Sequence, residues 1–452
     1  MKEVWRRVQG DTAEVPYIWT VRSTYMKKTA FAFIAILLFS FNLHAQQPDK
    51  IYMSNIHGIK LFLTGNQDAY PIIKVNSISG LELHFDDLGG GIKNYNYTYV
   101  LCDANWQPAN LSPFDYLQGF TQGKLMQYRN SSVAKTKYVH YQALLPEKNC
   151  VPKLSGNYLL KVYLNGDTSK LAFTRRILVL NDMIAVGAKI TQPFNTQRFR
   201  THQKLQFTVD KTKLNISNPQ QQLKVVVLQN FRWDNAVMNI QPTFMRGNSY
   251  EYNNETTLVF PGGRPYRWVD LRSFRFQSER VDSVDQNTVP FSVWLRPDMQ
   301  RTGLRYVSYV DRNGFFQVST TDVNNPWTQG DYANVHFTFV PKSIAALGGQ
   351  KVYLTGELAT GVCDDNSCEL DFNADKGVFE KTLLLKNGYY YYTYVTKASG
   401  SKNNATGTAD TEGDFSETEN TYTILVYYRS LSDRADQLVS AVTVDSRNLT
   451  QQ

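Results

Sequence analysis

The side chains in this sequence most suited to covalent or metal chemistry are those of its four cysteines, Cys102, Cys150, Cys363 and Cys368. In an oxidising compartment Cys363 and Cys368, which enclose four polar residues, either form a disulfide or stay free together. Cys102 and Cys150 are the other natural pair. Structural zinc is the competing chemistry, but neither spacing is the C-x₂-C of a zinc site and the histidines are scattered. The cysteines therefore predict disulfides and not a metal centre.

A second candidate for metal chemistry is the segment Asp-Phe-Asn-Ala-Asp at 371–375, whose alternating oxygen ligands resemble the start of a calcium loop. The rest of the pattern is missing, because Gly377 stands one place late and Thr382 occupies the position of the bidentate Glu. A polar turn between two strands is the preferred interpretation. We therefore expect no metal ion and no other cofactor.

Motifs for catalysis are missing from the sequence. It contains no G-x-S-x-G nucleophile elbow, no P-loop, no H-E-x-x-H and no G-x-G-x-x-G. Asp86 and Asp87 are adjacent, so on a strand they point to opposite faces and are expected to make a turn, not a catalytic carboxylate pair. We expect that the protein is not an enzyme. A secreted glycoside hydrolase, whose carboxylates can lie far apart in sequence, is the weakest alternative.

Aromatic residues could provide binding surfaces. Four consecutive tyrosines at 389–392 could stack against sugars or bases, but alternation along a strand places two of them in a core. Trp106, Trp233 and Trp268 are candidate interface anchors or core residues. The sequence therefore assigns no interface residue.

The hydrophobic pattern that must position these residues has a period of two, which predicts antiparallel strands. We expect strands over 81–86, 94–99, 157–164, 171–180, 223–228, 291–295, 306–310, 335–340, 352–355, 379–385, 389–395 and 422–428. Such strands predict an all-β protein of serial immunoglobulin- or fibronectin-like β-sandwich domains. An outer-membrane barrel is disfavoured because the segments are uneven and residues 225–228 are apolar on both faces.

The beginning of the chain predicts export. A basic start, an apolar run over 30–43 and a small residue at the cleavage position indicate a signal peptide over 26–45. Residues 1–25 are interpreted as an over-extended start. The apolar run is shorter than the roughly 20 residues of a transmembrane helix, so no direct membrane span is expected. The net charge of +8 falls when this segment is removed, and without a Lys/Arg run no nucleic-acid partner is expected.

Turn residues divide the exported part into three β units. We expect an N-terminal β-sandwich over 46–181, a middle β domain over 182–311, and an immunoglobulin-like β-sandwich over 312–452. The polar stretch 399–412 is predicted to be an exposed loop.

Short motifs along nearly the whole exported chain resemble the plug-protein family of the type 9 secretion system of Bacteroidetes. In chain order they are Leu83–Leu88 (LHFDDL), Cys102–Pro108 (CDANWQP), Tyr116–Phe120 (YLQGF), Ser155–Tyr158 (SGNY), Gln229–Asp234 (QNFRWD), Phe260–Gly263 (FPGG), Asp270–Ser273 (DLRS), Glu412–Phe415 (EGDF), Thr418–Asn420 (TEN) and Val426–Arg429 (VYYR). One departure is Arg264-Pro265, where an Asn-Glu pair is expected.

The resemblance implies a binding and sealing function. A member of this family is expected in the periplasm, held at the outer membrane through the translocon of the type 9 secretion system. There it would close the pore of the translocon when no cargo-accepting partner is bound. The resemblance implies no small-molecule ligand.

The main alternative is an exported carbohydrate-binding or adhesive protein. The unit 312–452 is similar to the glycogen-binding type of immunoglobulin-like module, but no tryptophan follows Trp327, so the usual sugar-stacking residues are missing. The similarity therefore predicts the fold of a glycogen-binding module that does not bind its sugar ligand.

Overall fold

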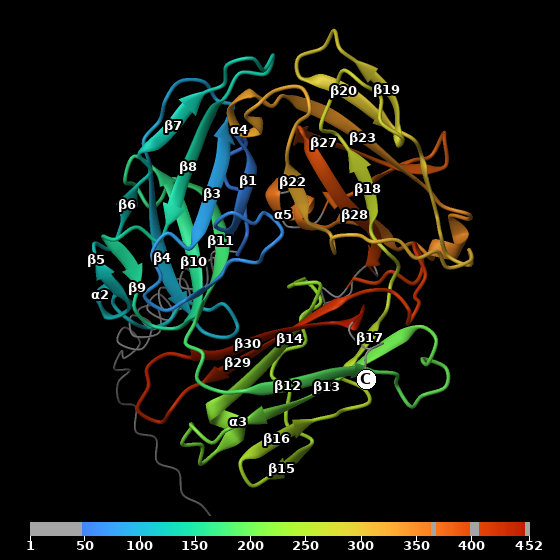
Figure 1. Ribbon diagram of the computed structural model, residues 1–452. Coiled ribbons are helices and arrows are strands. Elements are labelled where there is room, and N and C mark those ends of the chain that lie inside the picture. The colour runs from blue at the N-terminus through green and yellow to red at the C-terminus, as the bar shows by residue number, and fades with distance from the viewer. Residues whose placement is uncertain (1–47, 363–367, 398–405, 448–452) are drawn as a thin grey trace, which may run out of the picture. The chain divides into compact units, whose positions relative to one another are not determined.

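The computed structural model describes residues 48–362, 368–397 and 406–447, which belong to one compact unit of the chain. The predicted leader segments 1–25 and 26–45 lie outside the described residues. Almost all regular structure is β, arranged in pairs of sheets (Figure 1). Helices are single turns or slightly longer: α2 (Pro113–Tyr116), α3 (Pro219–Gln222), α4 (Pro326–Gln329), α5 (Glu357–Val362) and the 3₁₀ turn η1 (Ala345–Leu347). None of the described helices has the length and apolar character needed to cross a membrane.

The first sandwich contains residues 56–180. One sheet has the order β1 (Ile56–Leu63), β3 (Leu81–Asp87), β8 (Val139–Leu145), β7 (Gln127–Asn130). The other has the order β2 (Ile72–Lys74), β11 (Leu171–Leu180), β10 (Gly156–Leu164), β4 (Tyr95–Cys102), β6 (Gly123–Lys124), and β5 (Leu117–Gly119) pairs with β9 (Cys150–Pro152) apart from both. Alternate residues of β4 enter a core rich in aromatic rings, as the period of two predicts.

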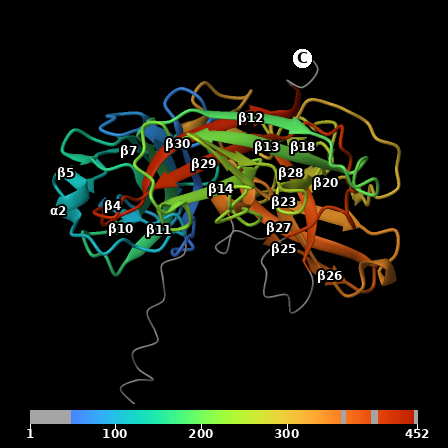
Figure 2. The same ribbon diagram turned by 90° about the horizontal axis from the view of Figure 1, so that it is seen from below.

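The second sandwich combines strands from two distant parts of the chain. One sheet has the order β12 (Val186–Thr191), β13 (His202–Asp210), β16 (Ser249–Tyr252), β15 (Phe244–Arg246), with β17 (Val259–Pro261) also paired to β13. The other has the order β14 (Leu223–Gln229), β29 (Thr421–Tyr428), β30 (Gln437–Asp445). Both views show the red strands β29 and β30 beside the green strands β12 to β14 (Figures 1 and 2).

The third sandwich is formed by the chain between β17 and β29. One sheet has the order β18 (Arg267–Asp270), β28 (Gly388–Lys397), β24 (Lys351–Thr355), β25 (Cys368–Glu369), with β22 (Phe316–Val318) on β28. The other has the order β19 (Val281–Asp285), β20 (Phe291–Leu295), β23 (Tyr332–Val340), β27 (Val378–Lys386), β26 (Asp371–Asn373), with β21 (Asp298–Met299) on β23. The all-β sandwich architecture expected from the sequence is confirmed.

The expected boundary between 182–311 and 312–452 is wrong. β14 from the expected middle domain pairs along its whole length with β29 from the expected last domain, and β18 to β20 join the third sandwich. The third sandwich is therefore an insertion into the second, and only the boundary at 181 follows the sheets. Two strands that pair although they lie about 200 residues apart are not marked by any turn residue or other local sequence feature.

The expected strand over 306–310 is also absent from the structure, although the chain there is fully described. Its aromatic side chains pack at a junction instead: the ring of Tyr306 lies 5.0 Å from that of Phe415, and the Tyr309 hydroxyl donates to the Tyr266 carbonyl oxygen at 2.9 Å. The other predicted strands are present, with ends that differ by a few residues.

Candidate functional site at the junctions between the sandwiches

The first and second sandwiches meet along an apolar seam. Val226 and Leu228 of β14 and Leu425 of β29 are fully buried there, while their neighbours Val225 and Val227 belong to the core of the second sandwich. This seam explains why residues 225–228 are apolar on both faces: one face fills a sandwich core and the other covers the first sandwich.

A hydrogen bond between two buried side chains crosses the apolar seam. The Tyr427 hydroxyl donates to Oδ1 of Asn157 at 2.7 Å, and both residues are buried. Tyr427→Phe should therefore lower the free energy of unfolding by about 1–2 kcal/mol, because a buried amide oxygen loses its partner. Chemical denaturation measures this effect, and Tyr128→Phe on an exposed ring is the matched control. Equal stability of the two variants would contradict the role assigned to this bond.

The first and third sandwiches meet through buried charges. Asp86 of β3 accepts hydrogen bonds from His140 Nδ1 at 2.7 Å, from Lys386 Nζ at 2.5 Å and from the Tyr332 hydroxyl at 2.5 Å. Asp86 and His140 belong to the first sandwich, Lys386 and Tyr332 to the third, and all are nearly inaccessible to solvent. The expectation that Asp86 makes a turn is wrong, although it does point away from Asp87, which bonds to Lys93 and Tyr95.

The environment sets the protonation states of this cluster. Burial alone would raise the pKa of Asp86, but Lys386 and His140 outweigh it and hold that pKa below its ordinary value. Burial, reinforced by His140, lowers the pKa of His84 to about 3, and His84 Nδ1 lies 3.1 Å from His140 Nε2. Burial also lowers the pKa of His140 and that of Lys386, while Asp86 opposes both shifts, so burial favours neutral imidazoles beside the Asp86–Lys386 ion pair.

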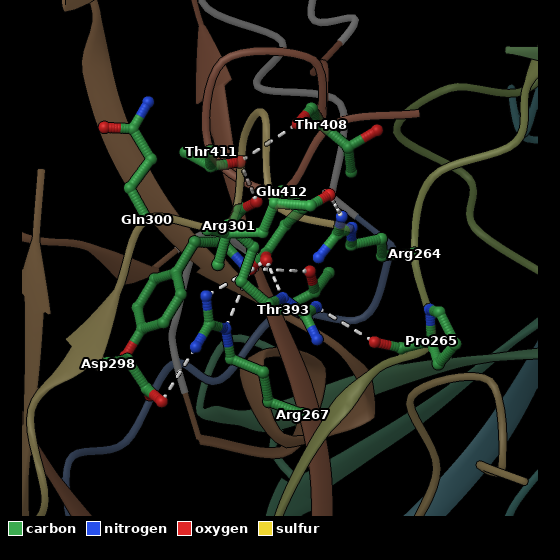
Figure 3. A network of polar contacts seen from close by, with 12 residues as sticks. Arg264, Pro265, Arg267, Asp298, Gln300, Arg301, Thr393, Thr408, Thr411 and Glu412 are labelled. Atoms are coloured by element: carbon green, nitrogen blue, oxygen red, sulfur yellow. Dashed lines mark hydrogen bonds and ion pairs between the residues drawn. The ribbon is translucent and has the colours of Figure 1, made fainter. Parts of the chain in front are cut away.

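The second and third sandwiches are joined where the chain crosses between them, after β17 and before β29. Figure 3 shows the Glu412 carboxylate held by two guanidinium groups, those of Arg267 and Arg301. Arg267 donates to Glu412 through Nε at 2.9 Å and Nη2 at 3.0 Å, and through Nη1 to Asp298 at 2.9 Å. The two crossing segments also contact each other, since the Gly263 amide donates to Asp414 Oδ1 at 3.1 Å.

Glu412 is fully buried, so the expectation that 399–412 is an exposed loop is wrong at its C-terminal end. Residues 399–405 lie outside the described residues. Burial would raise the pKa of Glu412, but the two arginines lower it to about 2. The carboxylate therefore stays charged and ties the returning chain to the third sandwich.

A cavity of about 520 Å³ lies where residues of all three sandwiches approach one another. The first sandwich and the chain before it contribute Asp49, Tyr70 and Arg175, and the second contributes the segment 230–234. The third contributes Phe315 and Glu357, among others. Its walls combine aromatic rings with charged and amide groups. The junction therefore encloses an open volume in addition to the direct contacts between the sandwiches.

Cys102 and Cys150 do not form the predicted disulfide. Cys102 and Cys150 are both free and buried. Cys102 faces the seam between the first two sandwiches, while Cys150 enters the core of the first sandwich, so their side chains lie on different sides of a sheet. Cys368 is disulfide-bonded, and Cys363 lies outside the described residues.

Burial raises the pKa of both free thiols to about 12, which makes the reactive thiolate scarce. We expect Cys102 and Cys150 to remain unmodified by Ellman's reagent in the folded chain at about pH 8, and both to react after unfolding without a reductant. A chain in which unfolding releases no additional thiol would contradict this state. A Cys102→Ser, Cys150→Ser double variant is the control.

The other residues singled out from the sequence have structural positions. Residues 371–375 form the short strand β26 and the start of the turn into β27, as preferred over a calcium loop. Tyr390 and Tyr392 are buried and their neighbours Tyr389 and Tyr391 are not, as alternation predicts. Within the described ranges, no three His, Cys, Asp or Glu side chains gather closely enough to hold a metal ion.

Two of the three candidate tryptophan anchors contact each other inside the molecule. The ring of Trp106 lies edge-on to that of Trp233 at 5.0 Å, and Trp106 is buried in the seam between the first two sandwiches. Trp268 stacks on Tyr389 at 5.7 Å in the third sandwich.

Comparison with known proteins decides the family. Residues 56–181 match the family model of the type 9 secretion system plug protein, first domain. The crystal structure of a hypothetical protein from Parabacteroides merdae ATCC 43184 is 31% identical, with a TM-score of 0.82 over 88% of this chain and 98% of that chain. The chain belongs to the type 9 secretion system plug protein family. The resemblance noted in the sequence is confirmed. No curated protein matches the chain.

Several of the motifs that carried the resemblance to the plug family lie at the junctions. Leu83–Leu88 contains Asp86, and Cys102–Pro108 contains Trp106 and Ala104, whose amide donates to Asp436 at 2.9 Å. Residues 230–234 of the motif Gln229–Asp234 line the cavity, and Glu412–Phe415 lies in the crossing. Arg264, where the sequence departs from the family pattern, also lies at the crossing, with its guanidinium carbon 4.6 Å from the centre of the Phe415 ring. Sequence reasoning found these motifs but not their joining role.

Proposed function

We propose that this chain is a non-catalytic plug subunit of the type 9 secretion system. It binds the periplasmic opening of the outer-membrane translocon and closes the pore when no cargo-accepting partner is bound. The match of residues 56–181 to the plug family carries the proposal. The proposed location is the periplasm, with attachment to the outer membrane through the translocon.

The joined sandwiches support this role physically. A pore wide enough for folded proteins leaks small solutes unless the body that fills it keeps its shape. Here the sandwiches are held by an apolar seam and by buried ion pairs, including Asp86 with Lys386 and Glu412 with Arg267. Domains joined only by short linkers would move independently, whereas buried contacts of this kind resist such motion.

Affinity purification tests the proposed attachment. The chain, tagged at its C-terminus and expressed from its own locus, is purified from detergent-solubilised outer membranes. We expect the translocon to co-purify, and the chain to leave the outer-membrane fraction in a strain that lacks the translocon. Recovery of the chain without the translocon, or unchanged membrane association in the deletion strain, would overturn the proposal.

A further inference from the structure

The cavity at the junction contains a buried cation that has no acidic partner in ion-pair contact among the described residues. Arg175 is only 5% exposed, and its guanidinium donates to two carbonyl oxygens, those of Thr174 and Thr360, each at 2.8 Å. Among the described residues no carboxylate lies within ion-pair distance of it. Burial lowers the pKa of Arg175 to about 10, although Asp49 and Glu357 oppose the shift at longer range.

The other charged groups around Arg175 are already paired. Arg176 is held by Asp49, and Arg232 by Asp234. Glu357 is held by the fully buried Lys60, which also lies over the ring of Phe316. Arg175 is thus a cavity-lining guanidinium with no carboxylate in direct contact among the described residues, and a buried charge without a direct partner is costly.

Backbone strain is concentrated at the same cavity. Nine non-glycine residues in the described ranges have a positive φ, and four of them line it: Asp49 (54°), Asn230 (52°), Phe231 (54°) and Asn313 (50°). Phe231 is the least suited to this conformation, because its side chain is bulky and without a local hydrogen bond. Its ring is held against that of Tyr70 at 3.7 Å. Strained residues of this kind cluster at ligand sites.

The walls and size of the cavity indicate the class of ligand. The ring of Tyr70 contacts those of Phe231 and Phe315 along the wall, and the remaining lining combines amide, hydroxyl and charged groups with aliphatic side chains. Such mixed walls suit a sugar ring, whose C–H faces pack on aromatic rings while its hydroxyls bind polar groups. About 520 Å³ is enough for one or two sugar units.

We propose that the cavity binds an acidic sugar, a uronate, whose carboxylate pairs with Arg175 while the ring packs against the aromatic wall. Because the lining comes from all three sandwiches, the bound sugar contacts each of them and stabilises their junction. This site is independent of translocon binding, and nothing in the proposed sealing role requires it.

A matched pair of probes tests the site on the full exported chain. Galacturonate and galactose differ only by the carboxylate, and binding is followed by the unfolding temperature and by tryptophan fluorescence, since Trp233 lines the cavity. We expect saturable binding of galacturonate, with galactose at least about tenfold weaker. No saturable response up to about 10 mM galacturonate, or equal responses to both sugars, would overturn the proposal.

Variants of Arg175 separate the charge from the fold. Arg175→Met should weaken galacturonate binding at least about tenfold, and Arg175→Lys, which keeps the charge, should weaken it less. Arg434→Met on the exposed surface is the control and should not change binding. Undiminished binding by Arg175→Met would overturn the assignment. If Arg175→Met does not fold, the galacturonate–galactose difference in the unmodified chain still decides the question.

Discussion

Asp86→Ala is expected to lower the free energy of unfolding by about 3–5 kcal/mol, the largest effect we predict for a single side chain. The substitution leaves the ammonium group of Lys386 buried without its only carboxylate partner among the described residues. It also removes the acceptor of the Tyr332 hydroxyl and of His140 Nδ1. Urea denaturation followed by circular dichroism measures the loss.

Two further variants serve as controls for Asp86→Ala. Asp167→Ala removes an exposed carboxylate paired with Lys170 and should leave the free energy of unfolding almost unchanged. The double variant Asp86→Leu, Lys386→Met removes both charges, and we expect it to recover much of the lost stability. A single variant as stable as Asp167→Ala would contradict the role of Asp86 in joining the first and third sandwiches.

Glu412→Gln is expected to lower the free energy of unfolding by about 3 kcal/mol at neutral pH. The pKa of Glu412 is about 2 in the folded chain, compared with 4.5 as its ordinary value, and each unit corresponds to about 1.4 kcal/mol. Because the folded-state pKa is depressed, the stabilisation is complete above about pH 4.5 and is lost as the pH falls toward 2. The difference between the unmodified chain and the variant should therefore shrink with acidification.

Denaturation of both proteins at about pH 7 and about pH 3 measures this change. Glu369→Gln removes an exposed partner of Lys351 and should have little effect at either pH. A difference for Glu412→Gln that stays constant or grows on acidification would show that the ionised carboxylate is not what joins the crossing to the third sandwich.

The local pattern of this sequence predicts its strands well because each strand buries alternate residues, which is a property of adjacent positions. The nesting of the third sandwich inside the second depends on the pairing of β14 with β29, which no local pattern records. The apolar residues 225–228 did contain a signal of that arrangement. A strand that is apolar on both faces must be covered on both, here by a sandwich core and by the seam.

The junctions were harder to predict than the sheets because their polar residues are of types that usually face solvent. Lys60 and His84 lie in apolar strands and are buried, yet only a partner sandwich makes them so. Alternation places both residues on the strand face opposite the core residues 59, 61, 83 and 85, so it predicts that they face solvent. Buried ion pairs add little net stability over apolar contacts, but they penalise any other arrangement of the sandwiches. Cys102 and Cys150 illustrate the same limit, since counting cysteines does not show which face of a sheet each one occupies.

Closure of the pore can be measured as a loss of electrical conductance through the translocon. Purified translocon lacking this chain is inserted into planar bilayers and its current is recorded before and after the chain is added to the periplasmic side. We predict that the unplugged translocon conducts and that the added chain abolishes the current. The Asp86→Ala variant, in which the first and third sandwiches are joined less firmly, should close the pore less completely. A current unchanged by a stoichiometric excess of the folded chain would contradict the proposed closure.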